Sequence, residues 1–151
     1  MAGAIVAIVL FVTACQQRPA IADAEFVHLP ATGWLSTVPL SFTPEYGDST
    51  LSYDLTLAVR HTNSYRYRNL SLVVDIIAAD SSVNRKTLDV TLADEYGRWM
   101  SGGFGSLYQT VVPLARNVAP VNAHYIVVWQ AMNGCDTLTG LVDVGVFAHP
   151  E

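Results

Sequence analysis

The stretch Thr50–Arg60 reads Thr-Leu-Ser-Tyr-Asp-Leu-Thr-Leu-Ala-Val-Arg, and its side chains alternate between apolar and mostly polar. The apolar positions that share one face are Leu51, Tyr53, Leu55, Leu57 and Val59. Successive side chains of a β-strand point to opposite faces of the sheet, so a period of two predicts a strand with one buried face. This stretch therefore predicts β-structure rather than a helix.

The same alternation recurs along the chain. Leu70–Ile76 and Thr87–Leu92 repeat it, and residues 123–131 and 141–147 are rich in the Val, Ile, Tyr and Trp that strands favour. Weaker candidates are residues 24–29, 38–42 and 107–114. Turn-forming residues lie between these segments, at Pro44–Asp48, Asp80–Asn84, Asn133-Gly134 and Thr139-Gly140. We therefore predict an all-β domain over residues 24–151, an antiparallel β-sandwich of the jelly-roll or immunoglobulin-like type with about eight strands.

Two connections, Arg60–Arg68 and Asp94–Ser106, are too long for tight hairpins. We expect them to cross between the two sheets or to lie at the rim of the sandwich. The second contains Gly102-Gly103-Phe104-Gly105, which lacks the Lys-Ser/Thr that follows in a phosphate-binding loop. We interpret these glycines as sources of positive φ in a turn or bulge between strands.

The N-terminus carries an apolar run, Ala4–Ala14, that is too short to span a bilayer and has the length of an export signal. Val12-Thr13-Ala14-Cys15 resembles the lipobox of bacterial lipoproteins, in which the cysteine is acylated and becomes the mature N-terminus. We predict a signal peptide over residues 1–14 and a lipidated Cys15 with a short linker over residues 15–23. The alternative is an ordinary signal peptide with a chance cysteine. If Cys15 carries lipid, Cys135 is the only thiol left, and we expect it to be passive.

Composition excludes some functional classes. The chain has 8 Lys and Arg against 13 Asp and Glu, so it has no basic face to offer a nucleic acid. The four histidines show no metal-binding spacing, and we expect each of them at the surface or half-buried: His28, His61, His124 and His149. The chain has no G-x-S-x-G motif. We expect no catalysis, no cofactor and no metal, although carboxylates paired across strands would be invisible in sequence.

Three segments combine into a family pattern. Arg60–Leu70 alternates cations and phenols, Leu92–Tyr108 sets aromatic residues among glycines, and Asp136–Val146 ends in Asp-Val-Gly-Val. With Gly33-Trp34 and the lipobox, these segments resemble the gliding motility lipoprotein GldH family. The chain departs from that pattern at Arg66, where a proline is common, and in the spacing of its glycines. The resemblance implies a small cell-envelope lipoprotein of the machinery by which some bacteria glide, without catalysis, cofactor or metal.

Two functions remain open at this point. The first is an interaction protein that is anchored to the lipid membrane through acylated Cys15 and docks onto other envelope or gliding-machinery proteins. Its candidate partner surface is Arg60, Tyr65, Arg66, Tyr67, Arg68 and Trp99, because Arg and aromatic residues concentrate at interfaces. The same residues could instead be packing, and we expect that for Trp99 more than for Tyr67.

The second function is a glycan-binding module that uses Trp34, Trp99 and Tyr67 as platforms. For location, Gln16 rather than Asp follows the cysteine. By the sorting rule known for some bacteria, this favours the outer membrane, facing the periplasm, over the inner membrane.

Overall fold

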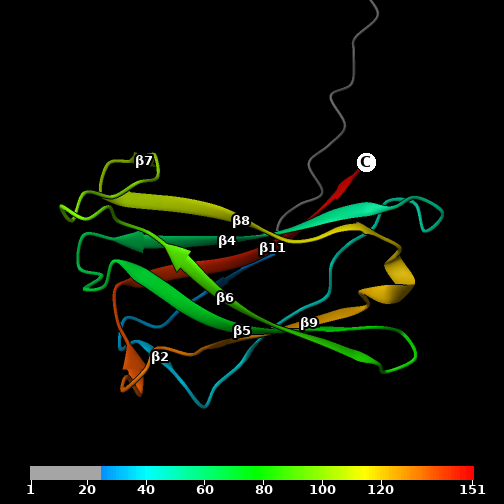
Figure 1. Cartoon of the computed structure of the whole chain (residues 1–151), viewed down its shortest axis with the longest axis horizontal. Helices are drawn as coiled ribbons and strands as arrows, with labels where there is room; N and C mark the ends of the chain where they lie inside the picture. The colour runs from blue at the N-terminus through cyan, green and yellow to red at the C-terminus, as the bar shows by residue number, and fades with distance from the viewer. Residues whose placement is uncertain (1–24) are drawn as a thin grey trace, which may run out of the picture.

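The structure is a computed structural model that describes residues 25–151 (Figure 1). Two antiparallel sheets stack face to face. The first has five strands in the order β1 (Glu25–His28), β11 (Leu141–Pro150), β4 (Tyr53–Thr62), β8 (Leu107–Val118) and β7 (Gly103–Phe104). The second has four in the order β3 (Leu40–Phe42), β9 (Tyr125–Gln130), β5 (Asn69–Ile77) and β6 (Val83–Thr91). A third, small sheet pairs β10 (Thr137–Leu138) with β2 (Trp34–Leu35), and one 3-10 turn covers Pro120–Asn122.

The predicted β-sandwich is confirmed. Each of the eight predicted strands is present, and the three that sequence reasoning missed are β2, β7 and β10, which have only two residues each and therefore show no period. Strand β6 begins at Val83, inside the predicted turn, because this edge strand is exposed along most of its length and its first half shows no alternation. Among residues 25–151 there is no helix long and apolar enough to cross a membrane.

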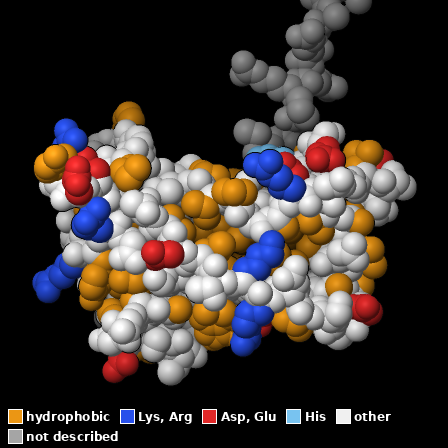
Figure 2. Space-filling model, viewed as in Figure 1, with side chains coloured by type: hydrophobic (Ala, Val, Ile, Leu, Met, Phe, Trp, Pro, Cys, Tyr) orange, Lys and Arg blue, Asp and Glu red, His pale blue; other side chains and the backbone are white. Residues whose placement is uncertain are grey.

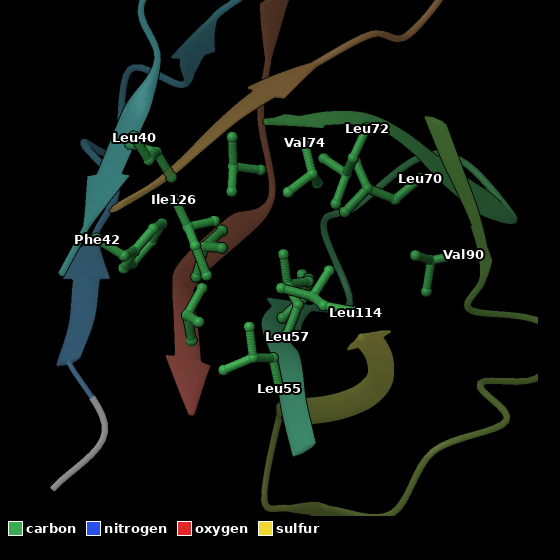
Figure 3. Packing of buried hydrophobic residues seen from close by; sticks show 14 of the residues in the cluster. Leu40, Phe42, Leu55, Leu57, Leu70, Leu72, Val74, Val90, Leu114 and Ile126 are labelled. Carbon is green, nitrogen blue, oxygen red and sulfur yellow. The ribbon is translucent and has the colours of Figure 1, made fainter. Parts of the chain in front are cut away.

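The core lies between the inner faces of the two large sheets. Leu55, Leu57 and Val59 of β4 are fully buried, as are Leu70, Leu72 and Val74 of β5. Figure 3 shows side chains of both sheets meeting in this layer, with Ile126 of β9 among them. Each such side chain contributes about 1.5–3 kcal/mol relative to an exposed position. Leu51 is the exception to the predicted face: it precedes β4 and is 46% exposed.

On one side of the sandwich, β6 is the edge strand of its sheet, and β8 is covered only at Leu107 and Tyr108, by the two-residue strand β7. The only lysine, Lys86, points inward from β6, and its Nζ donates a hydrogen bond to the Leu114 carbonyl of β8 at 2.6 Å. Figure 2 shows apolar side chains along the middle of this face, between the two strands. The ammonium therefore links the two sheets.

The two long connections cross between the sheets, as predicted. Residues 63–68 lead from β4 in the first sheet to β5 in the second, and residues 92–106 return from β6 to β8 through β7. Both lie at the same end of the sandwich, on the left of Figure 1, together with the connection 131–140. We call these three segments (63–68, 92–106 and 131–140) the loop end. The signal segment, Cys15 and the linker lie outside the described residues.

Candidate functional site

The loop end is built over a cluster of four aromatic rings: His61, Tyr65, Trp99 and Tyr108. His61 is the last inward-facing residue of β4 and lies opposite Tyr108 of β8. Its ring lies 4.4 Å from the Trp99 ring and stacks on Tyr108 at 5.4 Å, between ring centres. The Tyr65 ring lies 5.8 Å away. Since the four residues come from β4, β8 and both long loops, the cluster fastens the loops onto the sandwich.

His61 is fully buried, at 0% exposure, so the expectation of a surface or half-buried histidine is wrong for this residue. Its Nδ1 lies 3.2 Å from the Thr62 carbonyl, which can only accept, so Nδ1 carries the proton. The buried Nε2 has no hydrogen-bond partner. Burial lowers the pKa of His61 below its ordinary value, and the ring is therefore neutral at pH 7. The sequence did indicate this burial, because His61 follows Leu57 and Val59 at the next position on the same inward face of the strand.

Tyr65 is also part of the packing. It is only 3% exposed, and its hydroxyl donates to the Asn69 carbonyl at 2.8 Å. Burial raises the pKa of Tyr65 well above its ordinary value. Its backbone lies so close to Gly140 that a Cβ there would come within 2.5 Å of the Tyr65 N and Cα. The prediction that Tyr65 belongs to the partner surface is therefore wrong, because the ring turns into the sandwich.

Trp99 is half-buried and packs against the core, as expected for a rim residue. Its Nε1 donates to Asn63 Oδ1 at 2.7 Å. Asp94 shapes the turn that presents it: Asp94 Oδ1 accepts from the backbone N–H groups of Tyr96 and Arg98, both at 2.9 Å. The hydrogen bond from the Arg98 backbone is the main cause that lowers the pKa of Asp94. The contacts of the Asp94 carboxylate thus stabilise the turn that precedes Trp99.

Arg60 lies on the outer face of the five-stranded sheet, where it lines an open depression together with Gly102, Gly103 and Phe104 of the loop end. Its Nε donates to Gln109 Oε1 at 2.8 Å, and its Nη1 lies 3.6 Å from Asp143 Oδ2. Asp143 Oδ1 is also 2.8 Å from His28 Nδ1. The guanidinium covers the Phe26 ring at 3.7 Å from its centre. Arg60 therefore links four neighbouring strands on this outer face, and its place on a partner surface stays a prediction.

Tyr67 remains exposed at the loop end, as expected, at 41%. Arg66 and Arg68 beside it are exposed as well. Hydrogen bonding to the Cys135 thiol is the first cause that raises the pKa of Tyr67. Cys135 is half-buried, and its Sγ lies 3.3 Å from the Thr137 carbonyl. The thiol thus belongs to the packing of this end.

Sequence reasoning missed three exposed apolar side chains in the loop 92–106. Tyr96 is 76% exposed, Met100 64% and Phe104 96%. The sequence did indicate that Phe104 is exposed, because it lies between glycines in a segment without the alternation of a half-buried strand. We define the loop-end surface as six exposed side chains of the two crossing loops, which are Arg66, Tyr67, Arg68, Tyr96, Met100 and Phe104; the same loops also expose Asn63, Ser64, Glu95 and Arg98. On the left of Figure 2, apolar atoms lie among basic and acidic side chains at this end.

The platforms predicted for a glycan are mostly unavailable. Trp34 is 2% exposed and its Nε1 donates to the Val38 carbonyl at 2.7 Å, so its ring faces the interior. Trp99 is covered on one side by His61. Among residues 25–151, no group of three or more His, Cys, Asp or Glu side chains is arranged to hold a metal ion.

The segments that carry the family resemblance converge at the loop end. The Leu92 N–H donates to the Arg68 carbonyl at 2.7 Å, which joins the second segment to the first. The Thr62 N–H donates to the Gly140 carbonyl at 3.0 Å, which joins the first to the third. Residues as far apart in the sequence as Thr62 and Gly140 thus belong to one structural unit.

Comparison with known proteins agrees with this pattern. The sequence profile of the GldH lipoprotein family matches residues 23–147. A gliding motility lipoprotein GldH homolog of Christiangramia forsetii is 29% identical over 91% of this chain and 87% of its own length. The gliding motility lipoprotein GldH of Flavobacterium johnsoniae is 26% identical over 76% of each chain. The family prediction is confirmed, and the chain belongs to the GldH lipoprotein family.

Proposed function

We propose that the chain is a non-catalytic docking protein of the gliding machinery, held by acylated Cys15 on the periplasmic face of the outer membrane. Membership of the family supports a lipid-anchored gliding-motility lipoprotein of the cell envelope. The observation that carries the docking role is the loop-end surface. It exposes two tyrosines, a methionine and a phenylalanine on loops that the aromatic cluster holds in place.

The composition of this surface suits a protein partner. Aromatic residues, Met and Arg are the residue types enriched at protein interfaces, and the loop-end surface consists of six of them, beside the polar Asn63 and Ser64 and the acidic Glu95 that the same loops expose. A fully exposed Phe104 gains nothing in the free protein, whereas burial against a partner would contribute about 1.5–3 kcal/mol. Preorganised loops also lose less conformational entropy on binding. We therefore infer that the partner is an envelope protein with an apolar depression that receives Phe104 and Tyr67.

The experiment compares full-length tagged variants in the native host. Partner proteins are crosslinked in the envelope, recovered through the tag and quantified against wild type. We expect Tyr67→Ala and Phe104→Ala each to lower recovery by about tenfold or more, since truncation of a hot spot costs about 2 kcal/mol. Val121→Ala is the matched control, because Val121 is 59% exposed but lies in the 3-10 turn between β8 and β9.

Melting of the purified variants separates binding from folding. Both loop-end variants should melt within about 2 °C of wild type, because exposed substitutions change stability by about 0.5 kcal/mol or less. If both variants fold and recover the same partners as wild type and Val121→Ala, the loop-end surface is not the docking site.

A further inference from the structure

Strand β6 has an open edge along its whole length. Its nine residues, Val83–Thr91, pair with β5 on one side, and β6 is the last strand of its sheet. Two hydrogen bonds define which backbone groups face outward. The Leu92 N–H donates to the Arg68 carbonyl and the Ala78 N–H donates to the Ser82 carbonyl, just beyond the two ends of the β5–β6 pairing. Hydrogen-bonded pairs alternate along an antiparallel ladder, so the even-numbered residues of β6 are the ones that bond to β5. The odd-numbered residues therefore direct their N–H and C=O groups to the open edge.

The side chains of this edge are self-complementary about Thr87, the middle residue of the strand. When a second β6 runs antiparallel with Thr87 on the two-fold axis, Arg85 lies opposite Asp89 of the second copy, and Asp89 opposite its Arg85. Thr87 meets Thr87, which is a favourable cross-strand pair. In this register all nine residues overlap, and the five odd-numbered positions form hydrogen-bonded pairs.

Neighbouring two-fold registers are less favourable. An axis at Arg85 would oppose two guanidinium groups, an axis at Asp89 two carboxylates, and an axis at Lys86 two ammonium groups. Like charges directly opposite each other destabilise a strand pair. An axis at Leu88 opposes no like charges, but it loses both Arg85–Asp89 pairs. The register centred on Thr87 is thus the one that keeps both pairs, and it also gives the longest ladder.

The contacts within one copy leave room for this pairing. Asp89 accepts from Asn69 and Ser71 through Oδ1 only, at 2.6 and 2.9 Å, so its Oδ2 can accept from Arg85 of the second copy. Arg85 holds Asp75 through Nε and Nη2, at 2.6 and 2.7 Å, and its side chain is 65% exposed. Its Nη1 remains for the second carboxylate.

Lys86 does not obstruct the edge, because its ammonium turns between the sheets to Leu114. In the register centred on Thr87, its aliphatic stem lies opposite Leu88 of the second copy, which is only half-buried in one chain. We propose that two copies of this chain pair antiparallel through β6 about Thr87. The two four-stranded sheets then form one continuous eight-stranded sheet with an isologous interface.

Register-specific disulfide crosslinking tests the proposal in the full-length, membrane-anchored chain. The parent carries Cys135→Ser, and this parent alone controls for Cys15. Adding Thr87→Cys places two thiols on the axis, where opposed Cα atoms are about 5.5 Å apart and within disulfide reach. Adding Val83→Cys instead is the matched control, because in this register the two thiols would be about 27 Å apart along the strands.

We expect oxidation of envelopes to give a reducible dimer band with Thr87→Cys that is at least about tenfold stronger than with Val83→Cys or the parent. Adding Asp89→Arg to the Thr87→Cys chain opposes Arg85 with a second cation on both sides of the two-fold axis. The dimer band should then fall by about tenfold, whereas Asp89→Asn should reduce it less. No dimer band with Thr87→Cys, equal bands with Thr87→Cys and Val83→Cys, or a band unaffected by Asp89→Arg would overturn the proposal.

Discussion

Gly140→Ala should be among the most damaging single substitutions in this domain. Gly140 precedes β11 with a φ of +90°, a conformation that residues with a Cβ rarely adopt. A Cβ there would lie 2.5 Å from the Tyr65 N and Cα and 2.9 Å from the Ser64 carbonyl carbon. All three are backbone atoms, so no side chain can rotate away to make room. The substitution must therefore displace the loop 63–68 or the start of β11.

The magnitude follows from two terms. The positive φ costs about 1–2 kcal/mol for an L-residue. Overpacking against a backbone that cannot rotate costs about 1–3 kcal/mol more. Together the free energy of unfolding should fall by about 2–5 kcal/mol. For a domain of this size, about 4 °C of melting temperature corresponds to 1 kcal/mol, so the melting temperature should fall by about 8–20 °C.

Gly134→Ala isolates the steric term. Gly134 also has a positive φ, of +70°, but nothing lies within 4 Å of a Cβ built there. This variant should lose only the conformational term, about 1–2 kcal/mol or 4–8 °C. Thermal melting followed by far-ultraviolet circular dichroism measures both. Equal losses in Gly140→Ala and Gly134→Ala would refute the assignment of a backbone clash between Gly140 and Tyr65.

Three further predictions concern single residues. Burial lowers the pKa of His61 in the folded protein, so as the pH falls the unfolded chain is protonated at His61 before the folded protein is. The folded state is therefore most stable, with respect to this group, above about pH 6.5, and its free energy of unfolding falls with falling pH by up to about 1.4 kcal/mol per pH unit. His61→Phe should reduce the difference between the melting temperatures at pH 7.5 and pH 5.5. The same pH dependence of melting in His61→Phe and wild type would contradict this reasoning. Trp99→Ala should lower the free energy of unfolding, measured in urea, by about 2–4 kcal/mol. Trp99→Phe loses chiefly the hydrogen bond to Asn63 and should lower it by about 1 kcal/mol. Similar losses in both variants would show that the Trp99 ring does not pack against its neighbours. Cys15→Ala should abolish acyl labelling and stop cleavage before position 15, and labelled palmitate retained by this variant would show that Cys15 is not the lipidated residue.

The sequence pattern was sufficient for the framework of the fold. β4 and β5 each have one apolar and one mostly polar face, and a strand of this kind buries its apolar face. The alternation therefore identified Leu55, Leu57, Leu70 and Leu72 as core residues. It failed where burial does not alternate. The first half of β6 lies at an edge with both faces wet, and β2, β7 and β10 are too short to show any period.

Within the candidate site, local sequence could name the residue types but not their direction. Tyr65 and Tyr67 are two residues apart in the same loop, yet one is 3% exposed and the other 41%. Gly140, 75 positions away, allows the Tyr65 backbone to approach the start of β11, and the hydroxyl of the buried Tyr65 ring donates to the Asn69 carbonyl. No local period encodes such a contact.

Arg60 and His61 show the same division between local pattern and tertiary contact. As neighbours in one strand they must point to opposite faces of the sheet, and this much follows from the period of two. Their partners follow only from strand order. β11 and β8 flank β4, so Asp143 and Gln109 hold Arg60 on the outer face while Tyr108 stacks on His61 inside. The sequence by itself thus determined a β-sandwich and its family, whereas the pairing of distant strands decided which aromatic and basic side chains are packing and which remain for a partner.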